Sequence, residues 1–237
     1  MSDPRYIDLA SLTPDDSARV MLAIASAHLV CFPTDTVYGV GGALNHAVAA
    51  VIATAKGRDP KRPLQLVFPS RELLLEQVPM SAKLTDVMMR LTPGPITILV
   101  PYPKGFTVPD PGVVKHIVKG GLLRQSREET VQSLGVRVPN WPGNLSVLST
   151  LPFPLLASSA NPSGGKAPRS VDEVEPGLRS ACDLVLDGGP VDGRSSTVAD
   201  FTRYERDGSW RILRQGAWGE AEISEKLNRK REDLRRP

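Results

Sequence analysis

Apolar and polar residues alternate along this chain with two different periods. In the first half, helical spacing of apolar residues separates short, wholly apolar runs that are typical of buried strands. Helices are predicted from residue 13, where Thr13 can cap the first turn, and over residues 45–56, 72–78 and 82–91. Strands are predicted over residues 29–32, 64–68 and 96–101.

Strand-like runs become denser in the second half, over residues 134–138, 155–158, 184–186, 197–201 and 210–213. Residues 33–42 are expected to form a sharply turning loop, and residues 103–133 an irregular, basic inserted segment. Short strands that first alternate with helices and then crowd together predict an α/β fold with a mixed sheet. We expect one domain over residues 1–220 and a charged C-terminal tail over residues 221–237.

Composition narrows the class of protein. The chain has 237 residues, of which 41% are hydrophobic and 23% charged, as in ordinary globular proteins. A net charge of +3 is too small for a protein that coats DNA. The N-terminus lacks the apolar run of a secretion signal, and no apolar stretch approaches the length of a membrane span. The expected location is the cytoplasm, without membrane association.

Familiar catalytic and nucleotide-binding motifs are missing from the sequence. There is no Gly-rich loop of the Walker or dinucleotide-binding type, and residues 39–42 resemble one only superficially. The three histidines are scattered without the spacing of metal ligands, so no protein metal site is expected. Candidate chemistry must therefore come from other polar segments.

Two polar segments follow predicted strands or carry clustered charge in the first half. Residues 33–39, Pro-Thr-Asp-Thr-Val-Tyr-Gly, come directly after a buried strand, which is where ligands bind in open α/β sheets. Residues 56–64 hold four cations and two stiffening prolines, a pattern that suits a triphosphate. An ordinary solvated turn is the alternative for each segment.

Further polar groups occur in the second half. Residues 157–165, Ala-Ser-Ser-Ala-Asn-Pro-Ser-Gly-Gly, would present small hydroxyl and amide groups where a strand ends. Residues 193–198, Gly-Arg-Ser-Ser-Thr-Val, and residues 213–216, Leu-Arg-Gln-Gly, carry further cationic and polar side chains. Arg137 is a lone cation in an apolar strand, and a buried arginine needs a partner. That partner is either a carboxylate of the fold or an anionic ligand.

Taken in order, these segments resemble the YrdC-like family of threonylcarbamoyl-adenylate synthases. Seven motifs in one order, spanning most of the chain, argue against a chance match. They are Pro-Thr-Asp-Thr-Val-Tyr-Gly at 33–39, Lys-x-Arg-x-x-x-x-Pro-Leu at 56–64, Gly-Pro-Ile-Thr at 94–97, Val-Arg-Val-Pro at 136–139, Ser-Ala-Asn-Pro-Ser-Gly at 159–164, Ser-Thr-Val at 196–198 and Leu-Arg-Gln-Gly at 213–216.

The resemblance implies a twisted mixed sheet with helices around a large, positively charged cavity. It implies a nucleotidyltransferase that condenses L-threonine, bicarbonate and ATP to threonylcarbamoyl-AMP and pyrophosphate. That reaction is the first step of threonylcarbamoyladenosine formation in tRNA, and a separate transferase delivers the group. A weak direct contact with tRNA is left open.

The resemblance also implies residue roles. No nucleophile is required, because positioning and charge stabilisation carry the reaction, with Lys56 and Arg58 contributing. Mg²⁺ would enter with ATP, held mainly by its phosphates. The residues implied to bind ATP are Lys56, Arg58, Arg62, Ser159, Asn161 and Arg214. Those implied to bind threonine are Thr34, Tyr38, Arg137, Ser159 and Ser196.

The chain departs from the family pattern at several positions. Val67 stands where many relatives carry a histidine near the threonine, Ser195 replaces a frequent glutamate, and Gln215 replaces a proline. Residues 115–133 form a longer basic segment than usual, which is either a lid or a surface insertion. The reaction class is therefore predicted more firmly than the amino-acid specificity.

Two other functions remain open on the sequence alone. An RNA-binding module would use the cations of residues 56–64 to bind phosphates. Against this alternative, the three Trp, four Tyr and five Phe residues are not spaced for base stacking. A carbamoyl-adenylate-forming domain with another acceptor is the second alternative. Proteins of that kind carry zinc-finger cysteines and a transferase domain, and this chain has only two cysteines.

Overall fold

The fold is organised by one long sheet. The computed structural model describes residues 5–60, 62–108, 110–119, 132–141 and 143–229. Its strands are β1 (Tyr6–Asp8), β2 (Val30–Pro33), β3 (Tyr38–Ala43), β4 (Gln65–Val67), β5 (Ile96–Pro101), β6 (Val118–Lys119), β7 (Ser133–Arg137), β8 (Leu155–Ser159), β9 (Leu184–Asp187), β10 (Thr197–Asp200) and β11 (Arg211–Arg214).

Helices flank this sheet along its length. The α-helices are α1 (Pro14–Ala25), α2 (His46–Ala55), α3 (Arg71–Gln77), α4 (Ala82–Leu91), α5 (Val114–Ile117), α6 (Ser146–Ser149), α7 (Pro176–Ser180), α8 (Tyr204–Asp207) and α9 (Glu220–Asn228). Short 3₁₀ helices cover Leu9–Ser11, Pro111–Val113, Gly143–Leu145 and Val171–Glu173. None of the described helices combines the length and apolar character needed to cross a membrane.

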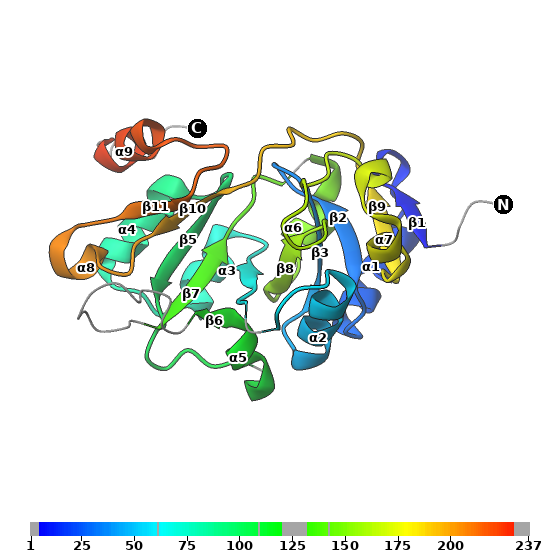
Figure 1. The fold of residues 1–237 in the computed structure, drawn as a ribbon, viewed down its shortest axis with the longest axis horizontal. Coiled ribbons are helices and arrows are strands. Elements are labelled where there is room, and N and C mark those ends of the chain that lie inside the picture. Colours follow the sequence, from blue (N-terminus) through cyan, green and yellow to red (C-terminus); the bar gives the residue numbers. More distant parts are fainter. Residues whose placement is uncertain (1–4, 61, 109, 120–131, 142, 230–237) are drawn as a thin grey trace.

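The strand order explains how distant segments meet. Within the described residues it is β1-β9-β2-β3-β8-β4-β7-β5-β10-β11, with β6 beside β7, and both parallel and antiparallel pairs occur. Figure 1 shows α1, α2 and α7 around the half that contains β2, β3 and β9, and α4, α8 and α9 around the half that contains β5, β10 and β11. The predicted α/β class with a mixed sheet is confirmed.

Local capping fixes the predicted helix starts. The Thr13 hydroxyl accepts a hydrogen bond from Asp16 N at 3.1 Å, and the Asp16 carboxylate accepts one from Thr13 N at 3.3 Å, which completes a capping box. Asn45 caps α2 by accepting from Val48 N at 2.8 Å. These bonds satisfy amide groups that the first helical turn leaves without partners.

The prediction of a loop over residues 33–42 is partly wrong. Residues 38–43 form β3, which pairs with β2 on one side and β8 on the other. Glycine weakens a strand, so the three glycines of this segment favoured the prediction of a loop. Here the glycines allow close packing: a Cβ on Gly41 would lie 2.4 Å from the Leu156 carbonyl oxygen.

Two other segments differ from simple expectation. Residues 109 and 120–131 of the predicted inserted segment lie outside the described residues, but α5 and β6 order part of the remainder, and β6 pairs with β7. In the region predicted to be a charged tail, α9 packs against α4 and its Ile223 is fully buried. Residues 230–237 of that region lie outside the described residues.

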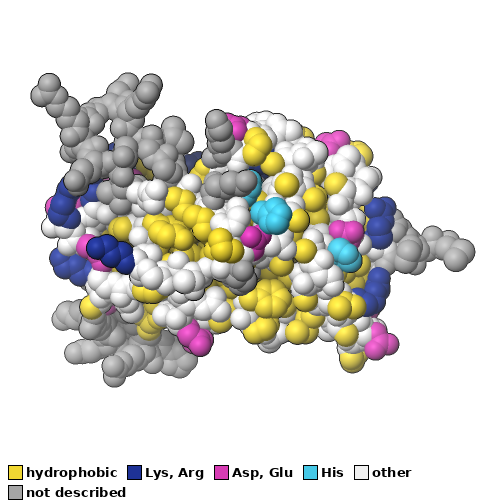
Figure 2. Space-filling model, turned by 90° about the horizontal axis from the view of Figure 1, so that it is seen from below, with side chains coloured by type: hydrophobic (Ala, Val, Ile, Leu, Met, Phe, Trp, Pro, Cys, Tyr) yellow, Lys and Arg dark blue, Asp and Glu magenta, His cyan; other side chains and the backbone are white. Residues whose placement is uncertain are grey.

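The face of the molecule drawn in Figure 2 carries its Lys and Arg side chains mainly towards its two ends. The middle of this face shows apolar, uncharged polar and histidine side chains, with acidic side chains next to the histidines. Among the described residues there, no continuous basic surface is visible. The described residues of this face therefore do not form the continuous basic surface that is typical of RNA-phosphate recognition.

Candidate active site

A cavity of about 280 Å³ lies against one face of the sheet. Strands present alternate side chains to a given face, and the lining follows this period. The central strands contribute residues in pairs two apart: Gln65 and Val67 from β4, Thr97 and Leu99 from β5, and Gly135 and Arg137 from β7. The cavity is therefore built on the middle of the sheet rather than in a surface loop.

Six of the residues predicted for the site line this cavity. They are Thr34, Arg58, Arg137, Ser159, Ser196 and Arg214. Three of these are arginines, and the described lining contains neither Asp nor Glu. The sheet order thus gathers motifs that are far apart in sequence into one positively charged pocket.

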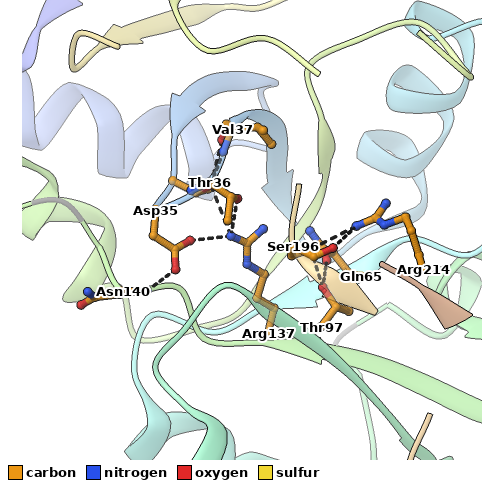
Figure 3. A network of polar contacts seen from close by, with 10 residues as sticks. Asp35, Thr36, Val37, Gln65, Thr97, Arg137, Asn140, Ser196 and Arg214 are labelled. Carbon is orange, nitrogen blue, oxygen red and sulfur yellow. Dashed lines mark hydrogen bonds and ion pairs between the residues drawn. The ribbon is translucent and has the colours of Figure 1, made fainter. Parts of the chain in front are cut away.

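Arg137 is held by the segment that follows β2 (Figure 3). Its Nη2 donates to Asp35 Oδ1 at 2.5 Å, to Thr36 Oγ1 at 2.7 Å and to Thr34 Oγ1 at 3.4 Å. The Arg137 side chain is only 4% exposed. Sequence reasoning left open whether its partner is a carboxylate or a ligand, and the structure supplies the carboxylate of Asp35.

One nitrogen of the Arg137 guanidinium is unsatisfied within the described residues. Its Nε is buried and has no hydrogen-bond partner within the described part of the chain. Burial lowers the pKa of Arg137, and the neighbouring Asp35 carboxylate opposes this by raising the pKa. A buried guanidinium that lines a cavity is suited to an anionic ligand.

A second polar network surrounds Ser196 (Figure 3). The Thr97 hydroxyl donates to Gln65 Oε1 at 2.8 Å and lies 3.1 Å from Ser196 Oγ. Because a hydroxyl has one proton, Ser196 must be the donor to Thr97. Ser196 Oγ then accepts from Arg214 Nη2 at 3.1 Å, and the Ser196 carbonyl accepts from the same nitrogen at 2.8 Å. The network orients Arg214.

Sequence reasoning missed Gln65 and gave Thr97 no role. Thr97 lies inside a recognised motif, which was the available signal, whereas Gln65 could be found only from its register beside β7 and β8. Burial lowers the pKa of Arg214, and the charge of Arg137 lowers it further. Two mutually repelling guanidinium groups on one cavity favour an anion between or beside them.

The Leu-Arg-Gln-Gly motif owes its glycine to close packing. A Cβ on Gly216 would lie 2.3 Å from the Ser195 carbonyl oxygen and 2.4 Å from Thr197 N. Ala217 N also donates to that Ser195 oxygen at 2.9 Å. The backbone after β11 therefore rests against residues 195–197, which keeps Arg214 next to Ser196.

Lys56 and Asn161, both predicted to bind ATP, hold a turn instead of lining the cavity. Lys56 Nζ donates to the carbonyl oxygens of Ser159 and Asn161. Burial, and then the charge of Arg58, lower the pKa of Lys56 to about 8. The Asn161 amide donates to Pro162 O at 2.9 Å and to Gly165 O at 2.6 Å, while its buried Oδ1 has no partner in the described residues.

Residues 56–64 are called the basic segment below. Of the described cations in this segment, Arg58 alone lines the cavity. Its Nη2 donates to the carbonyl oxygens of Arg62 at 2.8 Å and Pro63 at 3.2 Å, and its Nε is buried without a partner in the described part. Arg62 is exposed and reaches Ser163 Oγ at 2.9 Å. The segment thus presents one fixed cation to the pocket.

Tyr38 is not brought into the cavity. Its neighbour Gly39 lines the pocket, and successive strand residues point to opposite faces. The Tyr38 hydroxyl donates to Gly189 O at 2.8 Å and accepts from Gly188 N at 3.1 Å. Burial raises the pKa of Tyr38. Its position supports the loop after β9 rather than a contact with threonine.

Comparisons with known proteins show which proteins this chain resembles. A threonylcarbamoyl-AMP synthase of Pyrococcus abyssi is 32% identical over 186 residues, covering 76% of this chain and 49% of the relative. One of Bacillus subtilis is 30% identical over 195 residues, covering 81% of this chain and 51% of the relative. The chain therefore spans about half the length of these two relatives.

A solved structure extends the likeness to three dimensions. The crystal structure of P. abyssi Sua5 complexed with L-threonine gives a TM-score of 0.73 at 26% identity, covering 94% of this chain and 61% of that chain. The model of the Sua5, YciO and YrdC family, described as "Telomere recombination", matches residues 23–216. Because this match covers most of the sequence, the chain belongs to the Sua5, YciO and YrdC family.

Proposed function

We propose that this protein is a threonylcarbamoyl-AMP synthase, which condenses L-threonine, bicarbonate and ATP. The observation that carries this proposal is the cavity lined by Arg58, Arg137 and Arg214 without a lining carboxylate among the described residues. All three substrates bring negative charge, so such a lining suits them. Relatives of this chain bear the name of the same activity.

The two cavity networks suggest where the substrates bind. The guanidinium of Arg137, which lines the cavity with Thr34 and Ser196, is suited to the carboxylate of threonine. Val67 offers an apolar surface for the methyl group of the side chain. Arg58 and Ser159 also line the cavity and are suited to the phosphates of ATP. Lys56, Arg62 and Asn161 do not line the cavity, and they hold the turn that follows Ser159.

The reaction needs positioned charge rather than a protein nucleophile. The threonine amine attacks bicarbonate, and loss of water gives the N-carboxylate. An oxygen of that carbamate attacks the α-phosphorus of ATP, the bond from this phosphorus to the bridging oxygen breaks, and pyrophosphate leaves. Arg58 and Arg214 stabilise the charge that accumulates, and the rigid sheet holds the reacting groups together.

Mg²⁺ is assigned to the nucleotide. The described residues contain no group of three or more His, Cys, Asp or Glu side chains placed to hold a metal ion. The cavity lining that they form therefore does not fit a resident Mg²⁺, and the phosphates of ATP are the better ligands. No step of the reaction is assigned to a protein-bound metal.

The product is an activated acyl-adenylate that another protein must consume. We infer that a separate transferase passes the threonylcarbamoyl group to tRNA in the cytoplasm. The uneven basic charge in Figure 2 gives no support to a direct RNA-binding role for that face. The remaining alternative, another carbamoyl acceptor, depends on how the pocket discriminates threonine.

Pyrophosphate release tests the proposal. The purified protein, incubated with ATP, bicarbonate and threonine, is expected to release pyrophosphate at a rate that depends on each of the three. Omitting threonine or removing bicarbonate with a degassed buffer serves as the control, because both are consumed before the α-phosphate is attacked. Release that is independent of threonine would contradict the proposed substrate.

A further inference from the structure

Asp35 carries a largely buried carboxylate to which the proposed chemistry assigns no task. Its side chain is 10% exposed and does not line the cavity. Oδ1 accepts from Arg137 Nη2 at 2.5 Å, and Oδ2 accepts from Asn140 N at 3.0 Å. One carboxylate therefore holds both the guanidinium of Arg137 and the backbone that follows β7.

This contact joins parts of the sheet that are not neighbours. Asp35 follows β2, whereas Arg137 ends β7, and β3, β8 and β4 lie between these strands in the sheet order. Figure 3 shows the Asp35 side chain reaching towards Arg137 and Asn140. On the other side, Thr36 O accepts from Gly193 N at 2.7 Å, which ties the same loop to residues 188–196. Asp35 thus stands on a fixed loop.

The way in which Arg137 is held matters for its ligand. All three described hydrogen bonds of Arg137 leave from Nη2, to Thr34, Asp35 and Thr36. The Arg137 side chain also lines the cavity. An arginine side chain has much rotamer freedom, and anchoring one nitrogen removes most of it before a ligand arrives.

We infer that Asp35 is a positioning residue that fixes the guanidinium of Arg137 so that the part of it that lines the cavity meets the carboxylate of the amino-acid substrate. The inference rests on the proposed function, because it takes threonine as the ligand of Arg137. Thr34 and Thr36 contribute neutral acceptors to the same nitrogen, and Asp35 contributes the charged one. Charged acceptors make the stronger and more directional bond.

Asp35→Asn is the direct test, because asparagine keeps the shape but has one acceptor oxygen and an NH₂ group. It cannot accept from both Arg137 and Asn140, so Arg137 loses its fixed direction. We expect the KM for threonine in pyrophosphate release to rise roughly 10- to 100-fold, the range for loss of a well-placed charged hydrogen bond. The KM for ATP should change less than about twofold, since Arg58 is untouched.

A matched control separates positioning from general stability. Asp200 is similarly buried and pairs with Arg211 at 3.2 Å between β10 and β11, and neither residue lines the cavity. Asp200→Asn should lower the melting temperature and leave the KM for threonine unchanged. Asp35→Glu keeps the carboxylate, so it should fold and restore part of the threonine affinity.

The Arg137→Lys background shows whether Asp35 acts through Arg137. In that background, adding Asp35→Asn should raise the KM for threonine by much less than it does in the wild type. The reason is that lysine lacks the planar guanidinium that Asp35 orients. Full additivity would overturn the inference.

The outcomes distinguish this inference from the proposed function. A wild-type protein without threonine-dependent pyrophosphate release overturns the proposed function and the inference with it. An active wild type whose Asp35→Asn variant keeps its KM for threonine overturns the inference alone. So does a lower KM in Asp35→Asn, which would mean that Asp35 only neutralises Arg137 and competes with the substrate.

Discussion

Replacing Arg137 with alanine is expected to lower the free energy of unfolding by about 3–5 kcal/mol, the usual cost of removing one partner of a buried ion pair. The Arg137 and Asp35 side chains are 4% and 10% exposed, so Asp35 would be left as a largely buried carboxylate without its cation. Threonine-dependent turnover should be lost in the same variant. Urea unfolding monitored by circular dichroism measures the first effect.

The Arg211→Ala variant is the control for this change. Arg211 also pairs with a buried aspartate, Asp200, but its own side chain is 50% exposed. Its removal should cost no more than about 1 kcal/mol, as for other solvent-screened pairs. Equal stabilities of the Arg137→Ala and Arg211→Ala variants would contradict the account of Arg137 as the buried anchor of the cavity.

Replacing Arg58 with alanine is expected to weaken ATP binding by roughly 10- to 100-fold, as for loss of charged hydrogen bonds to phosphate. Among the described cations of residues 56–64, Arg58 is the one that lines the cavity. Its buried Nε lacks a partner in the described residues. Burial, and then the charge of Arg62, lower the pKa of Arg58, so an anion beside it relieves an unfavourable state. Calorimetric titration with ATP measures the affinity.

Arg206→Ala provides the comparison for Arg58. Arg206 lies on α8, its side chain is 65% exposed and it pairs with Asp207 at 3.0 Å. ATP affinity should be unaffected by its loss. If the Arg58→Ala variant bound ATP as tightly as the Arg206→Ala variant, the assignment of the phosphates to the basic segment would be wrong.

Local sequence signals predicted much of the fold because they act locally. The predicted bounds of α4 and β5 are those observed, and the caps at Thr13 and Asn45 form as expected. The strand β3 was missed because its stability comes from pairing with β2 and β8, not from the residues of Gly39–Gly42 themselves. Short β1 was missed for the same reason, since it depends on pairing with β9.

The motifs that form the candidate site were predictable from the sequence, but the directions in which their side chains point were not. The sequence named Arg137 and Ser196, and the sheet order brings both to the cavity. It could not show that Tyr38 and Gly39 point to opposite faces, because that requires knowing that they lie in a strand. Nor could it show that Asp35, one residue from Thr34, is the partner of Arg137, since 102 residues separate the pair.

Mass spectrometry of the product with ¹³C-labelled bicarbonate tests the central claim most directly. The account predicts a threonine-dependent adenylate that contains the threonine mass and carries the label, and that is not formed by the Arg137→Ala variant. An adenylate that lacks threonine or lacks the label, formed by active wild-type protein, would contradict the proposal that this cavity joins threonine, bicarbonate and ATP.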